Sequence, residues 1–131
     1  MSEITLVDLP VGKEPATRVI PMPADANHMG DIFGGWIMAQ VDLAASVPAR
    51  RAAKSRVATV AVNSFVFKQP VFIGDILSFY AEVTRIGRTS VTVNVEVFAQ
   101  REVTHAKAIK VTEATLTFVA LDEHKKPRVI V

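Results

Sequence analysis

A single helical pattern lies between a polar loop and a long series of β-strand patterns, and this arrangement restricts the possible folds most. Apolar side chains recur at three- and four-residue spacing over residues 36–47 (WIMAQVDLAASV), which predicts a helix with one apolar face. Residues 23–35 (PADANHMGDIFGG) have the composition of a loop. We expect Pro48 to end or kink the helix, because an interior proline removes a hydrogen bond and clashes with the preceding turn.

Almost all of the chain after residue 56 is predicted to be β-strand. Residues 56–67 (RVATVAVNSFVF) are β-branched and nearly all apolar, which indicates a strand buried on both faces. Residues 75–87 and 89–101 alternate apolar with polar side chains around a short turn, and a last strand is expected over residues 107–121. A first strand is expected over residues 17–22, ended by Pro21 and Pro23.

One apolar helix needs a curved sheet around it if its faces are to be buried. The order of elements therefore predicts an α+β chain with the hot-dog fold, a long central helix wrapped by a curved antiparallel β-sheet. A two-sheet sandwich is the alternative, but it leaves the helix without a place. The 131 residues suit one domain. We divide them into an N-terminal arm (residues 1–16), the hot-dog domain (17–123) and a C-terminal tail (124–131).

Composition excludes several classes of function. The chain has no cysteine, so disulfides, thiolate metal sites and a cysteine nucleophile are excluded. No set of His, Asp and Glu has ligand spacing, and we expect no metal. The histidines at positions 28, 105 and 124 lie in predicted loops or near strand ends, and no G-x-S-x-G motif is present, so a Ser-His-Asp triad has little support.

Charge and hydropathy indicate no nucleic-acid or membrane partner. The net charge is +2, and the basic residues are scattered as short pairs rather than gathered on one stripe with aromatic residues. The N-terminal residues have neither a basic nor an apolar segment of the kind found in signal peptides. No apolar run approaches the roughly 20 residues that span a bilayer. We expect a cytoplasmic protein.

Asp42 is the most unusual residue of the predicted helix. It lies among apolar residues, and no Lys or Arg stands three or four positions away. A solvated helix face would explain it without function. The alternative is that the carboxylate is buried. Burial raises the pKa of such a group unless hydrogen bonds hold it ionised.

Gly34 and Gly35 precede Asp42 by eight and seven residues, which places them about two helical turns away on roughly the same face. Helical side chains lean toward the N-terminus, so the carboxylate points to that end. The free N–H groups of a helix start can bind a developing oxyanion, and glycine allows a ligand close to the backbone. An ordinary turn before a helix is the alternative reading of the two glycines.

Four segments resemble the YciA-like acyl-CoA thioesterases, a hot-dog family. Residues 23–42, PADANHMGDIFGGWIMAQVD, are similar to the start of these enzymes around D-I-F-G-G-W-I-M-x-Q-x-D. The likeness continues through residues 57–75 (VATVAVNSFVFKQPVFIGD), 83–98 (VTRIGRTSVTVNVEVF) and 111–123 (VTEATLTFVALDE), so that it covers roughly residues 17–123.

The resemblance implies hydrolysis of acyl-CoA to a free acid and CoA, with no cofactor beyond the CoA of the substrate. By position, the catalytic aspartate is Asp42, acting as general base or nucleophile, and the oxyanion-binding backbone is that of Gly34 and Gly35. Asn27 matches an asparagine that positions the thioester or the water. Asp31 matches a loop acid, for which bracing of the loop is the favoured role. The resemblance also implies a site completed across a dimer interface.

Residues that contact CoA are implied in the same way. The turn Gly87, Arg88, Thr89 and Ser90 matches a family segment near the CoA nucleotide, and it offers a guanidinium, hydroxyls and backbone N–H groups to phosphate. Further basic candidates are Arg56 and Lys68. The backbone of Thr59, Val60 and Ala61 is expected to line the pantetheine arm.

Two other functions remain open at this stage. A hot-dog hydratase or dehydratase needs a histidine paired with an acid, and none accompanies Asp42 in the motif. A non-catalytic acyl-CoA-binding module would bind CoA without releasing a thiol. Whatever the function, a single hot-dog sheet leaves a long edge strand exposed, which usually pairs with a second copy. We therefore expect a homodimer, assembled further into a trimer of dimers.

Overall fold

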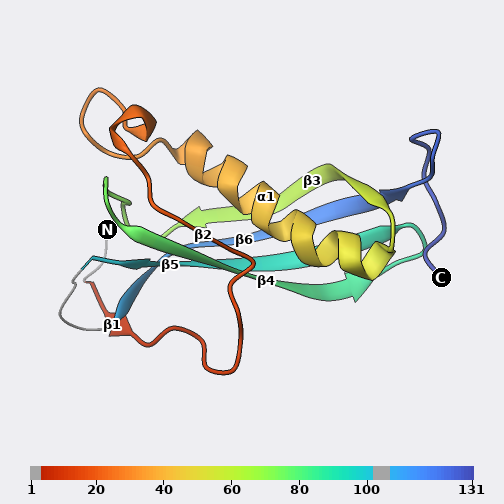
Figure 1. Cartoon of the computed structure of the whole chain (residues 1–131), viewed down its shortest axis with the longest axis horizontal. Coiled ribbons are helices and arrows are strands. Elements are labelled where there is room, and N and C mark those ends of the chain that lie inside the picture. Colours follow the sequence, from red (N-terminus) through yellow and green to blue (C-terminus); the bar gives the residue numbers. More distant parts are fainter. Residues whose placement is uncertain (1–3, 102–106) are drawn as a thin grey trace.

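The computed structural model describes residues 4–101 and 107–131, and within them it has the predicted α+β architecture. Its elements are, in chain order, β1 (Leu6–Val7), β2 (Thr17–Val19), the 3-10 helix η1 (Pro23–Asp25), α1 (Gly34–Ala53), β3 (Arg56–Phe67), β4 (Ile76–Ile86), β5 (Ser90–Gln100) and β6 (Ala108–Leu121). One long helix lies across one face of a twisted sheet (Figure 1).

The six described strands form one antiparallel sheet, in which five follow one another in the order β1-β6-β5-β4-β2. β3 also pairs with β6, and because β5 occupies the other side of β6, β1 and β3 lie one after the other along the same edge. β3 is therefore an edge strand over its whole length. β2, which pairs with β4, forms the opposite edge.

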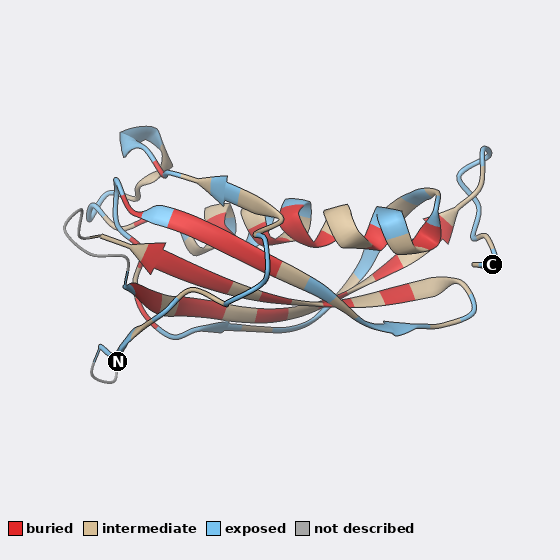
Figure 2. Ribbon diagram, turned by 60° about the horizontal axis from the view of Figure 1, so that its bottom comes forward, coloured by how far each residue is buried: buried red, intermediate tan, exposed pale blue. Residues whose placement is uncertain are grey.

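The core lies between α1 and the concave face of the sheet. Alternate residues of β5 point toward the helix, and Figure 2 shows the resulting buried bands on the strands. The helix meets them with small and branched side chains that are almost completely buried: Ile37, Val41, Ala44, Ala45, Ala49 and Ala53. The alanines let the helix backbone approach the sheet closely, so the helix axis is fixed over the strands.

α1 is longer than predicted at both ends. Gly34 and Gly35 are its first two residues rather than a turn before it, and the helix continues through Pro48 to Ala53. The expectation that Pro48 ends the helix is wrong, because the turns after Pro48 are held by burial of Ala49 and Ala53 against the sheet. Packing of this kind outweighs the single hydrogen bond that proline removes.

Two strand predictions also need correction. β3 has the predicted bounds, but it is not buried on both faces: Val60, Val62 and Val66 are 59%, 46% and 49% exposed. The cause is its edge position, since only β6 flanks it. β2 ends at Val19 instead of continuing to residue 22, and the carbonyl of Pro21 accepts a hydrogen bond from the N–H of Gly74 outside any strand.

The segments at both ends of the chain contact the sheet. Val7 and Leu9 pack against Tyr80 and Phe98. At the other end, the N–H of Arg128 donates to the carbonyl of Ala120 at 2.8 Å. Within the described residues no helix is long and apolar enough to cross a membrane. The division into arm, domain and tail stays a prediction.

Candidate active site

Asp42 lies on α1 at the border of its buried stripe, next to Val41, which is fully buried. Its side chain is half-buried. Its Oδ1 accepts a hydrogen bond of 2.5 Å from the hydroxyl of Thr59 on β3. The sequence offers this carboxylate no partner on its own helix, but the fold supplies one, 17 residues further along the chain. This bond joins the helix to the edge strand and holds the carboxylate in one orientation.

The strand segment that carries Thr59 is irregular. The register of β3 against β6 shifts between Thr59 and Ala61, so that Val60 has no partner in β6. Such a bulge redirects side chains and is frequent beside active sites. Here it leaves Thr59 facing the helix while Val60 is exposed at the edge. The residues expected to line the pantetheine arm are thus accessible.

The first turn of α1 presents uncapped N–H groups. The first hydrogen bond at the helix start runs from the N–H of Ile37 to the carbonyl of Phe33 at 3.2 Å, and no side chain caps the start. The N–H groups of Gly34 and Gly35 precede that bond and point out of the helix end. A Cβ on Gly35 would meet nothing within 4 Å. A ligand oxygen can therefore reach this backbone.

One chain alone does not bring Asp42 to its own helix start. Gly34 and Asp42 are eight residues apart on a continuous helix, which corresponds to about 12 Å along the axis. An aspartate side chain does not cover that distance. The spacing that suggested a common site places the two groups on one face, but too far apart to act on the same carbonyl group.

The loop before α1 is organised by Asn27. Its side-chain Oδ1 accepts hydrogen bonds from the N–H groups of Met29 at 2.9 Å and Asp31 at 3.1 Å, an Asx turn. The backbone N–H of Asn27 donates to the carbonyl of Asp31 at 2.6 Å. The side-chain oxygen of Asn27 thus shapes the loop that leads into the helix start. The hydroxyl of Ser46 bonds back to the carbonyl of Leu43 at 2.6 Å and not to Asp42.

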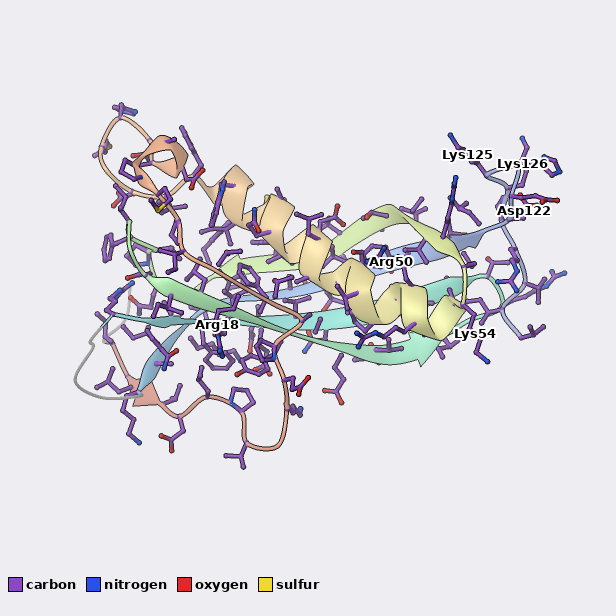
Figure 3. The ribbon with its side chains drawn as sticks, viewed as in Figure 1. Arg18, Arg50, Lys54, Asp122, Lys125 and Lys126 are labelled. Atoms are coloured by element: carbon purple, nitrogen blue, oxygen red, sulfur yellow. The ribbon has the colours of Figure 1, made fainter. Side chains whose placement is uncertain are left out.

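Basic residues gather where α1 ends. Arg56 lines a depression of about 390 Å³ together with Lys54 and Arg128, and the acidic residues Asp122 and Glu123 also line it. Figure 3 places Lys54 at the end of the helix, and it places Lys125 and Lys126 in the nearby C-terminal turn. Arg128 also donates to the carbonyls of Ala53 at 3.1 Å and Lys54 at 3.4 Å, which caps the helix.

The turn at residues 87–90 lies at this same end. The carbonyl of Arg88 accepts a hydrogen bond from the N–H of Ile130, and that of Thr89 accepts one from Ala120. Gly87 is closely packed there: a Cβ would lie 2.6 Å from the hydroxyl of Ser90, so a larger residue would make the Ser90 side chain move. The structure therefore brings Arg56 and the turn together with the C-terminal segment.

Lys68 is separate from this cluster. Its Nζ lies 3.6 Å from a carboxylate oxygen of Glu113. Glu113 on β6 is paired with Glu96 on β5, and the two neighbours of Glu96, Val95 and Val97, face the helix. The side chains of Glu96 and Glu113 therefore lie on the opposite face. Lys68 thus contacts the face of the sheet that points away from α1, and within one chain it does not join Arg56.

Sequence reasoning missed three side chains near the candidate site. It included Thr59 only for its backbone, and it missed the basic groups of Lys54 and Arg128 beside Arg56. No local pattern marks these side chains, because their partners lie 17 and about 75 residues away.

His28 and His124 are exposed, and His105 lies outside the described residues. Among the residues that the structure describes, no group of three or more His, Cys, Asp or Glu side chains is placed to hold a metal ion.

Sequence comparison finds related proteins over most of the chain. The thioesterase superfamily profile matches residues 29–106. The acyl-CoA thioester hydrolase YciA of Escherichia coli (strain K12) is 41% identical over 115 residues, which are 86% of this chain and 87% of that protein.

Solved structures are similar in fold and sequence. A hexameric hot-dog thioesterase of Campylobacter jejuni has a TM-score of 0.85 and 44% identity, with 90% of each chain covered. An acyl-CoA hydrolase of Staphylococcus aureus, solved in complex with butyryl-CoA, CoA and CoA disulfide, has a TM-score of 0.82 and 34% identity, with 87% of this chain and 69% of that chain covered.

Proposed function

This chain belongs to the thioesterase superfamily, and on that premise we propose that it hydrolyses acyl-CoA to a free carboxylic acid and CoA. The resemblance to the YciA-like enzymes is confirmed. We assign the catalytic carboxylate to Asp42 because the hydroxyl of Thr59 orients its side chain. Asp42 also lies on the helix whose start has no side-chain cap.

In the proposed reaction, the thioester carbonyl oxygen accepts hydrogen bonds from the N–H groups of Gly34 and Gly35. These donors stabilise the negative charge that develops on the oxygen as the carbonyl carbon becomes tetrahedral. Asp42 takes a proton from water, whose oxygen bonds to the carbonyl carbon, or its carboxylate attacks that carbon directly. The C–S bond then breaks. In the first route the CoA thiolate takes the proton that Asp42 removed from water; in the second, water hydrolyses the mixed anhydride to the free acid and the Asp42 carboxylate, and its proton goes to the thiolate. No metal or redox cofactor takes part in the proposed steps.

The position of β3 supports a site shared by two chains. Asp42 contacts Thr59 near the beginning of β3. Gly34 lies against Phe67 at the end of β3, where a Cβ added to Gly34 would be 3.2 Å from the ring. If two β3 edges pair about a two-fold axis perpendicular to the sheet, they run antiparallel, and the end of one lies beside the beginning of the other. The helix start of one chain then approaches Asp42 of its partner.

This arrangement resolves the separation of about 12 Å within one chain. It also supports a role for Asn27, whose loop would stand beside the partner's carboxylate. In the Staphylococcus aureus hydrolase, an asparagine and an aspartate 15 residues apart have each been replaced by alanine. Asn27 and Asp42 have the same separation. We therefore assign Asn27 to the site as a group that shapes the loop at the helix start and positions the thioester or the water.

We further propose that the dimer is the minimal active unit and that three dimers form the complete assembly. The exposed apolar side chains of β3 support the dimer, because a long unpaired apolar edge otherwise promotes aggregation. The solved Campylobacter jejuni relative is hexameric. Light scattering tests the assembly: a stable monomer with full activity would contradict it. A cytoplasmic location stays a prediction.

We also assign CoA recognition to the basic end of the molecule. Arg56 and the backbone of residues 87–90 would meet the nucleotide phosphates, joined by Lys54 and Arg128. The strand segment Thr59, Val60 and Ala61 begins beside Asp42, three residues along β3 from Arg56, which suits an extended pantetheine arm lying along this strand. Lys68 would take part only if a second chain brings it near.

Replacement of Asp42 tests the hydrolase function. We expect Asp42→Asn and Asp42→Ala to lower kcat/KM for acyl-CoA by at least about 100-fold, the usual contribution of a general base. The measurement is thiol release with DTNB, with circular dichroism to verify folding. Ser46→Ala is the matched control, because its hydroxyl lies one turn further along and bonds only to Leu43. Near wild-type turnover in folded Asp42→Ala would reject the mechanism.

A single turnover in H₂¹⁸O distinguishes the two roles of Asp42. If Asp42 activates water, the acid product carries the label from the first turnover. If Asp42 attacks directly and water then opens the mixed anhydride at the aspartyl carbon, the first product takes an unlabelled oxygen from the carboxylate and the label enters Asp42.

A further inference from the structure

A small apolar cavity opens beside the helix start. It has a volume of about 200 Å³, and its walls include Ile32, Gly34, Ile37, Phe67, Pro70 and Val71. Gly34 belongs both to this wall and to the backbone proposed to bind the thioester oxygen. The carbonyl carbon of a thioester bound there would stand at the entrance of the cavity.

We propose that this cavity holds the acyl chain of the substrate and limits its length, with Val71 and Phe67 as the residues that determine the limit. The inference rests on the proposed hydrolase function. An apolar cavity of about 150 Å³ is known to accept benzene. The larger volume here suits an acyl chain of about six to eight carbon atoms, on the same order-of-magnitude comparison.

The entrance of the cavity is formed by backbone and an aromatic ring. A Cβ at Gly34 would lie 3.2 Å from Cζ of Phe67, so any larger residue at position 34 would push against the ring. Phe67 also contacts Phe65, with ring centroids 5.0 Å apart. The ring is thereby held beside the helix start, where it narrows the space available to the acyl chain.

The wall opposite the helix is fixed by a buried ion pair. Nε of Arg101 lies 3.1 Å from both carboxylate oxygens of Asp75, and Asp75 is 3% exposed. The guanidinium also donates to the carbonyl of Pro70 at 2.6 Å and lies 4.6 Å from the ring centre of Phe72. Arg101 therefore anchors the segment that carries Val71.

The same segment is joined to the loop before the helix. The N–H of Ile32 donates to the carbonyl of Val71 at 3.2 Å, and Asp31 forms a bridge with Phe72. Val71 itself is 2% exposed. Because both walls are linked by backbone contacts, the cavity cannot widen freely for a longer chain, which is the condition for discrimination by length.

Two polar residues modify what the cavity accepts. Asp31 and Gln69 also line it. An acyl chain that ends in its own carboxylate would bring a second negative group toward Asp31, and like charges at close range repel. The cavity is thus suited to uncharged acyl chains and disfavours those derived from dicarboxylic acids.

A panel of acyl-CoA substrates from two to sixteen carbons tests the inference. For wild-type protein we expect kcat/KM to rise about fourfold with each methylene that enters the cavity, a factor that follows from the usual transfer free energy. The rise should stop at about six to eight carbons. Succinyl-CoA should react at least about tenfold more slowly than butyryl-CoA because of Asp31.

Val71→Ala enlarges the cavity and should move the optimum to longer chains by one or two carbons. The matched control is Val83→Ala, which removes the same atoms from a residue packed against the same core but outside the cavity. It should keep the wild-type length profile. In case Val71→Ala does not fold, Phe67→Trp, at a position 41% exposed in the single chain, should shift the optimum to shorter chains.

The outcomes separate the two proposals. The cavity assignment alone would be overturned if Val71→Ala and Phe67→Trp both release CoA with the same dependence on chain length as the wild-type protein. It would also be overturned if kcat/KM of the wild-type protein shows no maximum up to sixteen carbons. Absence of CoA release from every substrate by folded wild-type protein would overturn the hydrolase function instead.

Discussion

The hydroxyl of Thr59 donates a 2.5 Å hydrogen bond to Oδ1 of Asp42, and this bond joins the central helix to the exposed edge strand. It links the group proposed for chemistry to the strand proposed for dimerisation. A shift of β3 would therefore change the orientation of the carboxylate. Catalysis and assembly are expected to depend on each other for this reason.

Thr59→Val should lower kcat by about 10- to 100-fold with little change in KM. A hydrogen bond to a charged group contributes about 1.5–3 kcal/mol, and each 1.4 kcal/mol corresponds to a factor of ten. Steady-state kinetics with one acyl-CoA provides the measurement. Thr59→Ser, which keeps the hydroxyl, should restore most of the rate. Equal kinetics for the valine and serine variants would exclude a positioning role for the hydroxyl.

Val62→Lys should dissociate the assembly and remove activity together. Val62 lies on β3 and is 46% exposed in the single chain, and a lysine on an edge strand opposes pairing with a second copy. Sedimentation velocity and thiol release on the same samples give the two readings. Ile86→Lys, at a 53% exposed residue of β4, is the control and should retain both mass and activity. A fully active Val62→Lys monomer would refute the shared site.

Arg56→Ala should weaken the recognition of CoA phosphates without affecting the reaction centre. We expect KM for an acyl-CoA to rise about tenfold with kcat unchanged, because the guanidinium contacts the substrate equally before and during the reaction. The comparison substrate is the acyl-pantetheine, which lacks the nucleotide. Its kcat/KM should be the same for wild type and variant. An equal loss on both substrates would place Arg56 outside the phosphate site.

The acid limb of stability should depend on Glu113. Lys110 donates a hydrogen bond to Glu113 and lies 2.6 Å from a carboxylate oxygen of Glu96. The hydrogen bond from Lys110 lowers the pKa of Glu113 below its ordinary 4.5, although burial acts in the opposite direction. For Lys110, burial acts to lower the pKa, but the hydrogen bonds to Glu113 and Glu96 raise it above 10.5.

The signs follow from linkage between protonation and folding. The contribution of Glu113 is complete above pH 4.5 and is lost as pH falls through its lowered folded-state pKa. The contribution of Lys110 is complete below pH 10.5 and is lost as pH rises through its raised pKa. Both side chains are partly exposed, so solvent screening keeps these contributions small.

Urea unfolding of Glu113→Gln between pH 3 and pH 7 tests the acid limb. The free energy of unfolding of the variant should lie below that of wild type at pH 7, and the difference should shrink as pH falls below 4.5. Glu123→Gln, at an exposed residue, should follow the wild-type curve. A difference that stays constant over the whole range would contradict the assignment to Glu113.

Sequence periodicity located α1 and the four long strands. The spacing of apolar residues in residues 36–47 located the helix, and alternation in β4 and β5 located the strands, because each pattern directly reflects the geometry of its element. Burial in β4 does not follow the alternation, since Ser78 and Tyr80 are buried as well. The bounds of β3 were also predicted correctly. The length of α1 was not, because burial of Ala49 and Ala53 against distant strands carries the helix past Pro48.

The sequence by itself determined the family, the hot-dog architecture and the identity of Asp42 and the two glycines as site candidates. Only the tertiary structure decided that Thr59 orients Asp42, that β3 is an exposed edge, and that Asp42 and its own helix start stand too far apart to share a carbonyl group. The reason is that periodicity specifies which way a side chain points within its element. Contacts between elements depend on strand order, register and the path of the helix over the sheet, which only packing of the whole chain establishes.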